Sequence, residues 1–200
     1  MPCKKCASRR RCGTLRPVFK SAANQHDPRW QHVQQFQSGT IPGDLRDWLL
    51  DEQSLTERLI KASDDNFRVQ RLSQRWQRPF LSECRLLGIP QGQWALVREV
   101  ALHGHEQPWV YARSVMPAAT LHGRLRRLRR LQDRSLGALL FQQASLAREE
   151  FELALLPPNS QFIAAGLRQA SPAWARRSCF RLFGQRLLVS EVFLERFQAR

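Results

Sequence analysis

The spacing of hydrophobic residues changes along the chain, and its first clear pattern predicts a pair of helices. Apolar residues recur at helical spacing over 44–51 and again over 55–62. Ser54 and Glu57 fit the S-x-x-E capping box, in which each side chain can satisfy a free N–H group at the start of a helix. We therefore expect two short helices joined by a tight turn, with ordered structure starting near Pro42.

A second helical pair is predicted over 120–141. In its first part, leucines fall on one stripe and arginines surround that stripe, as in an amphipathic helix. A shorter leucine stripe follows Asp133 and Ser135, either of which could cap it. The first stripe is Leu121, Leu125, Leu128 and Leu131, its arginines are Arg124, Arg126, Arg127, Arg129 and Arg130, and the second stripe is Leu136, Leu139 and Leu140.

Several other segments have the pattern of β-strands. Near the C-terminus, 177–183 and 186–194 are expected to form a hairpin. Its two-residue loop, Gly184-Gln185 with Gly first, is typical of a type II′ turn. The earlier predicted strands, of which the last two form another hairpin, are 67–76, 94–102 and 109–116.

The segment Ala144–Leu156 is ambiguous. It is rich in Ala, Leu and Glu, so intrinsic propensity predicts a helix there. The remaining pattern indicates an α+β fold, with an antiparallel sheet and helical pairs between its strands.

The length and composition suggest one domain with an N-terminal extension. The 200 residues suffice for one substantial domain. Residues 1–40 carry clustered Arg, Lys, Gln and Cys without periodicity, so we expect a poorly ordered basic extension before a domain over 41–200. No run approaches the roughly 18 apolar residues that span a bilayer, and no apolar stretch follows the basic N-terminus as in a secretory signal. A cytoplasmic protein is the expectation.

The chain is strongly basic, with a formal net charge of +15 from 32 Lys and Arg against 17 Asp and Glu. Such an imbalance admits nucleic acid, an anionic membrane surface or acidic small molecules as partners, and it selects none of them. The segment Arg124–Arg130 could grip phosphates, but it lacks the aromatic residues on which bases stack. A solvated helix face explains it better, so an obligatory nucleic-acid partner is not expected.

Cysteine and histidine give little sign of a metal site. Cys3, Cys6 and Cys12 suggest a zinc knuckle, but the fourth ligand would have to be His26 or His32, and no second C-x-x-C pair supports it. The five cysteines are odd in number, which disfavours a disulfide framework. We therefore expect no metal.

The other sequence motifs that carry chemistry are weak. His103, His105 and His122 flank predicted turns and are expected to be solvated. The chain has no Gly-rich phosphate loop, H-E-x-x-H or G-x-S-x-G motif.

Two charged residues fall in otherwise apolar rows of predicted strands. Successive strand side chains point to opposite faces, so Arg98 shares its face with Val100, and Glu191 shares its face with Val189. A charge in apolar surroundings is costly unless it is paired. The two could form a structural ion pair, or each strand could lie at a solvated edge.

The other interpretation is that both charges line a ligand cavity. The planar fork of Arg98 would bind a carboxylate through two parallel hydrogen bonds. Glu191 in an apolar wall would hold its proton more readily and could donate it near neutral pH.

Taken together, these segments resemble the chorismate lyase (chorismate–pyruvate lyase) family. The similarity runs in order from about Ile41 to Phe193, and the order and spacing of the segments are more specific than any one of them. The matching segments are Leu45-Arg46-Asp47-Trp48-Leu49-Leu50, Ser54-Leu55-Thr56, Trp94-Ala95-Leu96-Val97-Arg98-Glu99-Val100, 108–117, 135–141, 174–178 and 187–194.

The resemblance implies a six-stranded antiparallel sheet with two helix-turn-helix flaps over a buried ligand cavity. It also favours a strand rather than a helix over 144–153. Carried over to this chain, Arg98 binds the ring carboxylate and Glu191 contacts the hydroxyl end of the ligand, these two being the expected catalytic residues. Backbone near Leu136 adds hydrogen bonds, and Leu55 lines the pocket where well-known family members have Met, a residue of similar size.

The implied activity is elimination of pyruvate from chorismate to give 4-hydroxybenzoate, the first step of ubiquinone biosynthesis, by a monomer without metal or organic cofactor. Arg176 or Arg177 is a candidate partner for the pyruvyl carboxylate. One alternative is a ligand-binding domain of the same fold that catalyses no reaction, as in some bacterial transcription regulators. A basic nucleic-acid-binding protein is the other.

Overall fold

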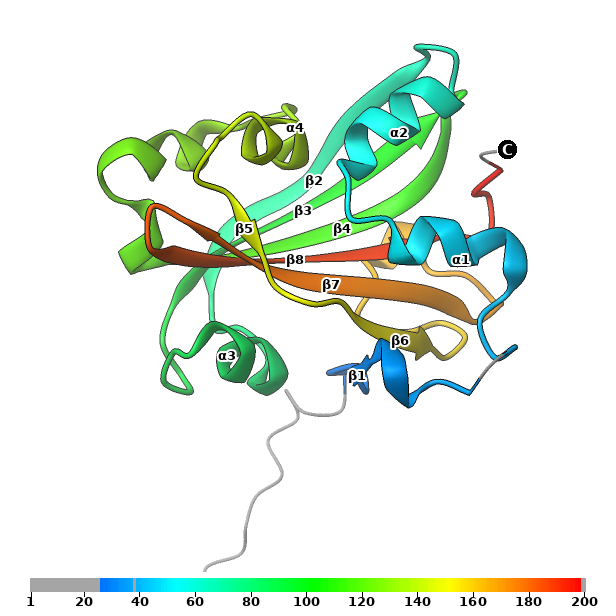
Figure 1. Ribbon diagram of the computed structural model, residues 1–200, viewed down its shortest axis with the longest axis horizontal. Helices are drawn as coiled ribbons and strands as arrows, with labels where there is room; N and C mark the ends of the chain where they lie inside the picture. Colours follow the sequence, from blue (N-terminus) through cyan, green and yellow to red (C-terminus); the bar gives the residue numbers. More distant parts are fainter. Residues whose placement is uncertain (1–25, 38, 199–200) are drawn as a thin grey trace, which may run out of the picture.

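The computed structural model describes residues 26–37 and 39–198, which form one antiparallel sheet with helices on both faces (Figure 1). The strands are β1 (Gln31–His32), β2 (Phe67–Gln77), β3 (Ala95–Gly104), β4 (Gln107–Pro117), β5 (Ala147–Arg148), β6 (Glu152–Leu156), β7 (Ala173–Leu182) and β8 (Gln185–Phe193). The sheet order is β1-β6-β7-β8-β4-β3-β2, and β5 pairs with the far end of β7. The α+β prediction is confirmed.

The expected number of six strands is wrong, because the sheet has eight. The two extra strands, β1 and β5, contain two residues each, which is too short to produce an alternating pattern in the sequence. β1 lies within the segment expected to be an extension, yet it pairs with β6 through Gln31 opposite Leu153. The described fold therefore starts before the boundary expected at residue 41.

Two helical pairs cover one face of the sheet. We call α1 (Gly43–Leu50) and α2 (Leu55–Ala62) the first flap. The second flap contains two 3-10 helices, η3 (Ala118–Leu121) and η4 (Gly123–Arg130), followed by α4 (Leu136–Phe141). In Figure 1, α2 and α4 lie above the sheet, and α3 (Leu81–Leu87) lies below it. Two short 3-10 turns, η2 (Val33–Gln35) and η5 (Ala165–Leu167), complete the helices of the described residues.

Local sequence explains where the flap helices begin. The Ser54 side chain accepts a hydrogen bond from the backbone N–H of Glu57, and Ser135 accepts one from Ala138. Ser135 rather than Asp133 therefore caps α4. The stripe Leu121, Leu125, Leu128 and Leu131 is buried as predicted, although the segment winds as 3-10 helix.

Three details of the predicted secondary structure need correction. The segment Ala144–Leu156 contains β5 and β6 and no helix, so the strand that the resemblance implied is nearer the truth than the helix of propensity. The helix α3, which follows Pro79, was not predicted. The C-terminal hairpin turns at Phe183-Gly184, one residue earlier than expected, and both residues have positive φ (50° and 75°), which is typical of a type I′ turn.

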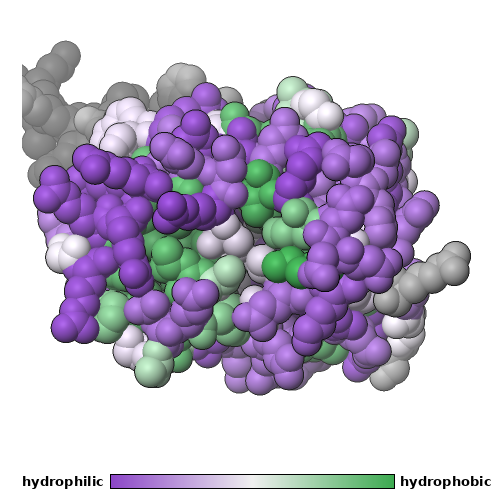
Figure 2. Space-filling model, turned by 90° about the horizontal axis from the view of Figure 1, so that it is seen from above, coloured by the Kyte–Doolittle hydropathy of each residue, from purple (hydrophilic) through white to green (hydrophobic). Residues whose placement is uncertain are grey.

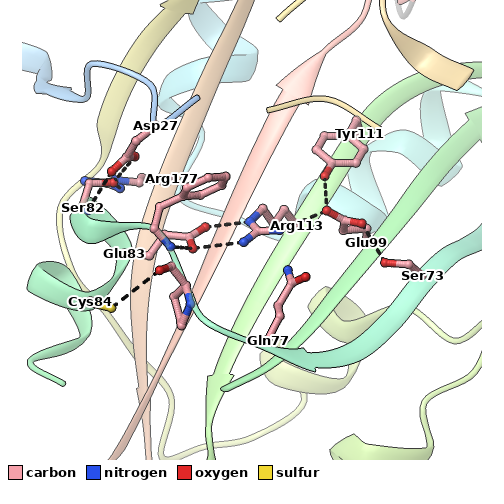
Figure 3. A network of polar contacts seen from close by, with 12 residues as sticks. Asp27, Ser73, Gln77, Ser82, Glu83, Cys84, Glu99, Tyr111, Arg113 and Arg177 are labelled. Carbon is pink, nitrogen blue, oxygen red and sulfur yellow. Dashed lines mark hydrogen bonds and ion pairs between the residues drawn. The ribbon is translucent and has the colours of Figure 1, made fainter. Parts of the chain in front are cut away.

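The sheet face away from the flaps holds a buried network of charged residues beneath α3 (Figure 3). Arg113 on β4 donates to both carboxylate oxygens of Glu83 on α3, at 2.7 and 3.2 Å, and to Glu99 on β3 at 3.0 Å. Glu99 also accepts hydrogen bonds from Tyr111 and Ser73. Burial alone would raise the pKa of Glu99, but these three donors together lower it.

We expect the substitution Glu99→Gln to destabilise the fold at neutral pH by about 1–3 kcal/mol, because buried Arg113 loses one of its two carboxylate partners. Since the pKa of Glu99 is lowered in the folded state, the stabilisation is present above the ordinary carboxyl pKa and is lost as the pH falls below it. Urea unfolding of both proteins at pH 7 and near pH 4 should show the difference in unfolding free energy shrink at the lower pH. A difference that is the same at both pH values would contradict this role.

Candidate active site

A narrow cavity of about 30 Å³ lies between the sheet and the two flaps. Strands β3, β4 and β8 supply its floor, and the flaps supply its roof. All four residues expected at the ligand site line this one cavity: Leu55, Arg98, Leu136 and Glu191. Its other walls are largely apolar, with Val100, Leu102, Leu140, Phe180 and Val189 among them.

Arg98 lies on β3 and is almost fully buried, with 1% of its surface exposed. Its Nη2 donates hydrogen bonds of 2.8 Å to the backbone carbonyls of Gln132 and Arg134, in the second flap. Its Nε has no hydrogen-bond partner among the described residues. Burial lowers the pKa of Arg98 to about 10, which leaves it charged at neutral pH. The side chain therefore carries a positive charge and a free donor at the cavity wall.

Glu191 lies on β8, and its partner is not Arg98. Its Oε2 accepts a hydrogen bond of 2.7 Å from Nε of Arg176, which lies directly opposite it on β7. The Nη1 of Arg176 also donates to the carbonyls of Trp48 and Asp51, at the end of α1. The expectation of purely apolar surroundings for Glu191 is thus wrong. The remaining oxygen, Oε1, accepts no hydrogen bond from the described residues and is available to a ligand.

Arg148 on β5 is the cavity residue that sequence reasoning missed. Its guanidinium lies 4.0 Å from the ring centre of Phe151 and 5.0 Å from that of Phe180. It also donates to Ser178 Oγ at 3.1 Å and to the carbonyl of Glu52, in the turn of the first flap, at 3.0 Å. Burial, and then repulsion from Arg176, lower the pKa of Arg148 to about 10, so it too is charged at neutral pH.

The two arginines expected at the pyruvyl carboxylate lie elsewhere. Arg177 is on the opposite face of the sheet, where it pairs with Glu152 at 2.6 Å and donates to Ser82. The guanidinium of Arg176 already donates hydrogen bonds to Glu191 and to the first flap, and Arg176 does not line the cavity. Arg148 lines the cavity, whereas neither of these two arginines does.

The flaps touch each other over the cavity. The Thr56 hydroxyl in the first flap and the Ser135 hydroxyl in the second are 2.6 Å apart and share a hydrogen bond. The contact is close, since a Cβ added at Gly137 would lie 3.0 Å from Thr56 Oγ1. A cavity of this size holds about two water molecules, so a ring-sized ligand can enter only if the flaps part.

The described residues contain no group of three or more metal-ligating side chains close enough to hold a metal ion. Cys3, Cys6 and Cys12 of the suggested zinc knuckle lie outside the described residues. His103 is buried rather than solvated, and its Nε2 lies 2.9 Å from Gln70 Oε1, so its expected exposure is wrong. Over the stretch that the structure covers, the helices are all too short or too polar to traverse a bilayer.

We expect Glu191→Gln to reduce the unfolding free energy by about 2–3 kcal/mol, because it leaves the buried guanidinium of Arg176 without a carboxylate. Urea unfolding at pH 7 measures the loss. The matched control is Glu150→Gln, an exposed glutamate without an ion pair among the described residues, which should stay within about 0.5 kcal/mol of the parent protein. Equal effects of the two substitutions would show that the Arg176–Glu191 pair does not stabilise the fold.

Known proteins of one family are similar to this chain in sequence. The sequence profile of the chorismate lyase family matches residues 25–199. A probable chorismate pyruvate-lyase of Pseudomonas aeruginosa is 42% identical over 168 residues, which cover 82% of this chain and 90% of the relative. Another from Methylococcus capsulatus is 41% identical, covering 75% of this chain and 94% of the relative.

Solved structures share the fold at much lower identity. The C-terminal domain of PhnF superposes with a TM-score of 0.52 at 14% identity, over 64% of this chain and 82% of that domain. The ligand-binding domain of a putative GntR-family transcriptional regulator from Bordetella bronchiseptica gives a TM-score of 0.50 at 18% identity, over 68% and 91% of the two chains. At this level of identity, the similarity concerns the fold alone.

Proposed function

The chain belongs to the chorismate lyase family, and from that premise we propose that it eliminates pyruvate from chorismate to leave 4-hydroxybenzoate. One observation carries the proposal beyond the family match. One cavity brings together two guanidiniums, those of buried Arg98 and partly buried Arg148, and the carboxylate of Glu191. Chorismate carries two carboxylates and one ring hydroxyl. Each guanidinium of the cavity can therefore pair with one carboxylate, and Glu191 can accept a hydrogen bond from the hydroxyl.

The reaction requires little of the protein beyond binding and orientation. The bond between the ring carbon and the enolpyruvyl oxygen breaks, and the hydroxyl-bearing ring carbon loses its hydrogen. The ring becomes aromatic, and the hydrogen ends on the methylene carbon of the leaving group, which becomes pyruvate. Because aromatisation supplies the driving force, the enzyme must hold the reacting conformation, exclude water and stabilise charge on the departing oxygen.

Arg98 is the proposed partner of the ring carboxylate. Its unpartnered Nε can donate to the ligand while Nη2 keeps its two hydrogen bonds to the second flap. Leu136, at the first position of α4, is proposed to add its backbone N–H, which no helical carbonyl accepts at that position. Leu55 faces the same cavity from the first flap and is proposed to contact the apolar ring face.

Glu191 is the proposed partner of the ring hydroxyl. Arg176 pairs with Oε2, which leaves Oε1 to accept a hydrogen bond from the hydroxyl. This differs from the role of a proton donor that apolar surroundings would give it. A carboxylate in this position fixes the orientation of the ring and keeps the hydroxyl-bearing carbon in place.

Arg148 is the proposed partner of the enolpyruvyl carboxylate. It lies near enough to Glu191 for their charges to interact, which supports a position at the hydroxyl end of the proposed ligand. Its guanidinium is already fixed by Ser178 and by Glu52 O, so little side-chain freedom is lost on binding. A positive charge there also stabilises negative charge that develops on the leaving oxygen.

The remaining expectations stay predictions. They are a monomer in the cytoplasm, no cofactor, and a product that enters ubiquinone biosynthesis. The division of the chain at residue 41 is also a proposal, with β1 of the preceding segment pairing onto the sheet of the domain over 41–200.

The decisive assay mixes the purified chain with chorismate and follows the absorbance of 4-hydroxybenzoate. We expect turnover by the parent protein, and a fall in kcat/KM of at least about tenfold for Arg98→Ala, since a buried charged contact to the ligand is lost. Arg71→Ala, an exposed arginine on the neighbouring strand, is the matched control and should leave turnover unchanged. Unaltered turnover by Arg98→Ala would remove Arg98 from the site.

The proposed roles of Arg98 and Arg148 can be distinguished by measuring which ligand each variant binds less tightly. Arg98 faces a carboxylate that substrate and product share, whereas Arg148 faces one that only the substrate carries. Arg148→Gln should therefore raise KM for chorismate about tenfold or more while the Kd of 4-hydroxybenzoate changes less than about threefold. Arg98→Ala should weaken both. Parallel losses of both ligands in Arg148→Gln would mean that Arg148 only supports the first flap.

The same assay separates the enzyme from a regulator-like ligand-binding domain. That alternative rests on the shared fold of the PhnF and GntR-family domains alone. Tight binding of chorismate without release of 4-hydroxybenzoate would favour it.

A further inference from the structure

One end of the sheet collects arginines and exposed aromatic rings. Four chain segments meet there, because β2 ends opposite the start of β3, β3 starts opposite the end of β4, and the β7–β8 turn follows alongside. The helix η4 covers the same end, since Gln74 Nε2 on β2 donates to Arg129 O. We call this region, comprising residues 74–79, 89–95, 117–132 and 181–187, the basic end.

The basic end contains no Asp or Glu. Its arginines are Arg75, Arg78, Arg124, Arg126, Arg127, Arg129, Arg130, Arg181 and Arg186. Among the described residues, only the last two form ion pairs, both with Glu149. In Figure 2 elongated hydrophilic side chains project over the end where η4 lies, with hydrophobic atoms visible between them. A basic surface of this kind attracts polyanions.

Three large aromatic side chains stand exposed in the same region. Trp94 is 54% exposed, Trp76 43% and Phe183 40%. They come from the loop before β3, the end of β2 and the β7–β8 turn. Each has an arginine guanidinium within 6.0 Å of its ring centre. A solvated helix face explains the arginines of η4, but it does not explain rings exposed on three separate segments.

We propose that the basic end docks onto a bilayer containing anionic phospholipids. Tryptophan and other rings settle at the level of the lipid headgroups, where an apolar body meets a polar boundary. Arginines around them pair with lipid phosphates, and each basic residue near an anionic membrane surface adds about 1 kcal/mol. Rings on three strand ends and turns, interleaved with unpaired arginines, match this interfacial pattern.

Nucleic acid fits the same surface less well. Proteins that bind single strands line a basic groove with rings on which successive bases stack. Here each ring comes from a different strand end or turn, and none of them lines the cavity between the flaps. The basic end also uses no residue proposed for chorismate, so docking and lyase activity can fail independently.

The test is co-sedimentation of the full chain with large unilamellar vesicles at 150 mM NaCl. We expect binding to vesicles of phosphatidylcholine and phosphatidylglycerol in a 3:1 ratio, and little to pure phosphatidylcholine. The variant Arg126→Gln/Arg127→Gln should lower the partition coefficient about tenfold or more. Its matched control, Arg29→Gln/Arg46→Gln, removes the same charge from exposed arginines outside the basic end and should change it less than about threefold.

The rings require a second readout. Tryptophan fluorescence should be quenched by vesicles with brominated acyl chains, and Trp76→Phe/Trp94→Phe should lose most of that quenching while turnover of chorismate is unchanged. Equal losses in the two double arginine variants, no quenching, or binding of a single-stranded oligonucleotide in preference to the anionic vesicles would each overturn the proposal. If the parent protein shows no lyase activity, the result of the vesicle-binding experiment still stands by itself.

Discussion

A buried guanidinium is costly when its donors lack hydrogen-bond partners, and on the flap side of this sheet backbone carbonyls accept most of the hydrogen bonds that the arginines donate. Arg98 holds Gln132 O and Arg134 O in the second flap, and Arg176 holds Trp48 O and Asp51 O in the first. Arg148 reaches Glu52 O in the turn between α1 and α2. The same side chains that give the cavity its charge thus anchor its roof. Cavity and roof form together because neither satisfies its polar groups without the other.

The two faces of the sheet balance charge in different ways. On the α3 side, Arg113 and Arg177 meet the carboxylates of Glu83, Glu99 and Glu152, so the positive charges of these two arginines are fully compensated there. On the flap side, Glu191 is the one carboxylate among the described residues that lines the cavity, whereas Arg98 and Arg148 line it and Arg176 lies just behind it. Carbonyl oxygens satisfy hydrogen bonds without cancelling charge. The flap side therefore keeps a positive excess, which a dicarboxylate of ring size neutralises.

The sequence predicted those parts of the site that follow from a repeating pattern. Alternation along β3 and β8 placed Arg98 and Glu191 in apolar rows, and both line the cavity. The partner of Glu191 could not be found in this way, because it depends on hairpin register. With the predicted loop Gly184-Gln185, Ser178 would lie opposite Glu191, whereas the observed turn at Phe183-Gly184 puts Arg176 there. Arg148 was missed because β5 has only two residues, too few to reveal which face a side chain takes. Strands and flap helices long enough to show a period were found, but the helix α3 and the strands β1 and β5 were not.

The hydroxyl contact between Thr56 and Ser135 closes a chamber that has room for about two water molecules. A larger molecule passes this contact only when the two flaps separate, so the opening motion of the flaps limits the rate of ligand entry and exit. The rate of ligand exchange should then rise steeply with temperature, because opening the flaps breaks packed contacts and has a large activation enthalpy. Diffusion through an open channel would depend on temperature only weakly.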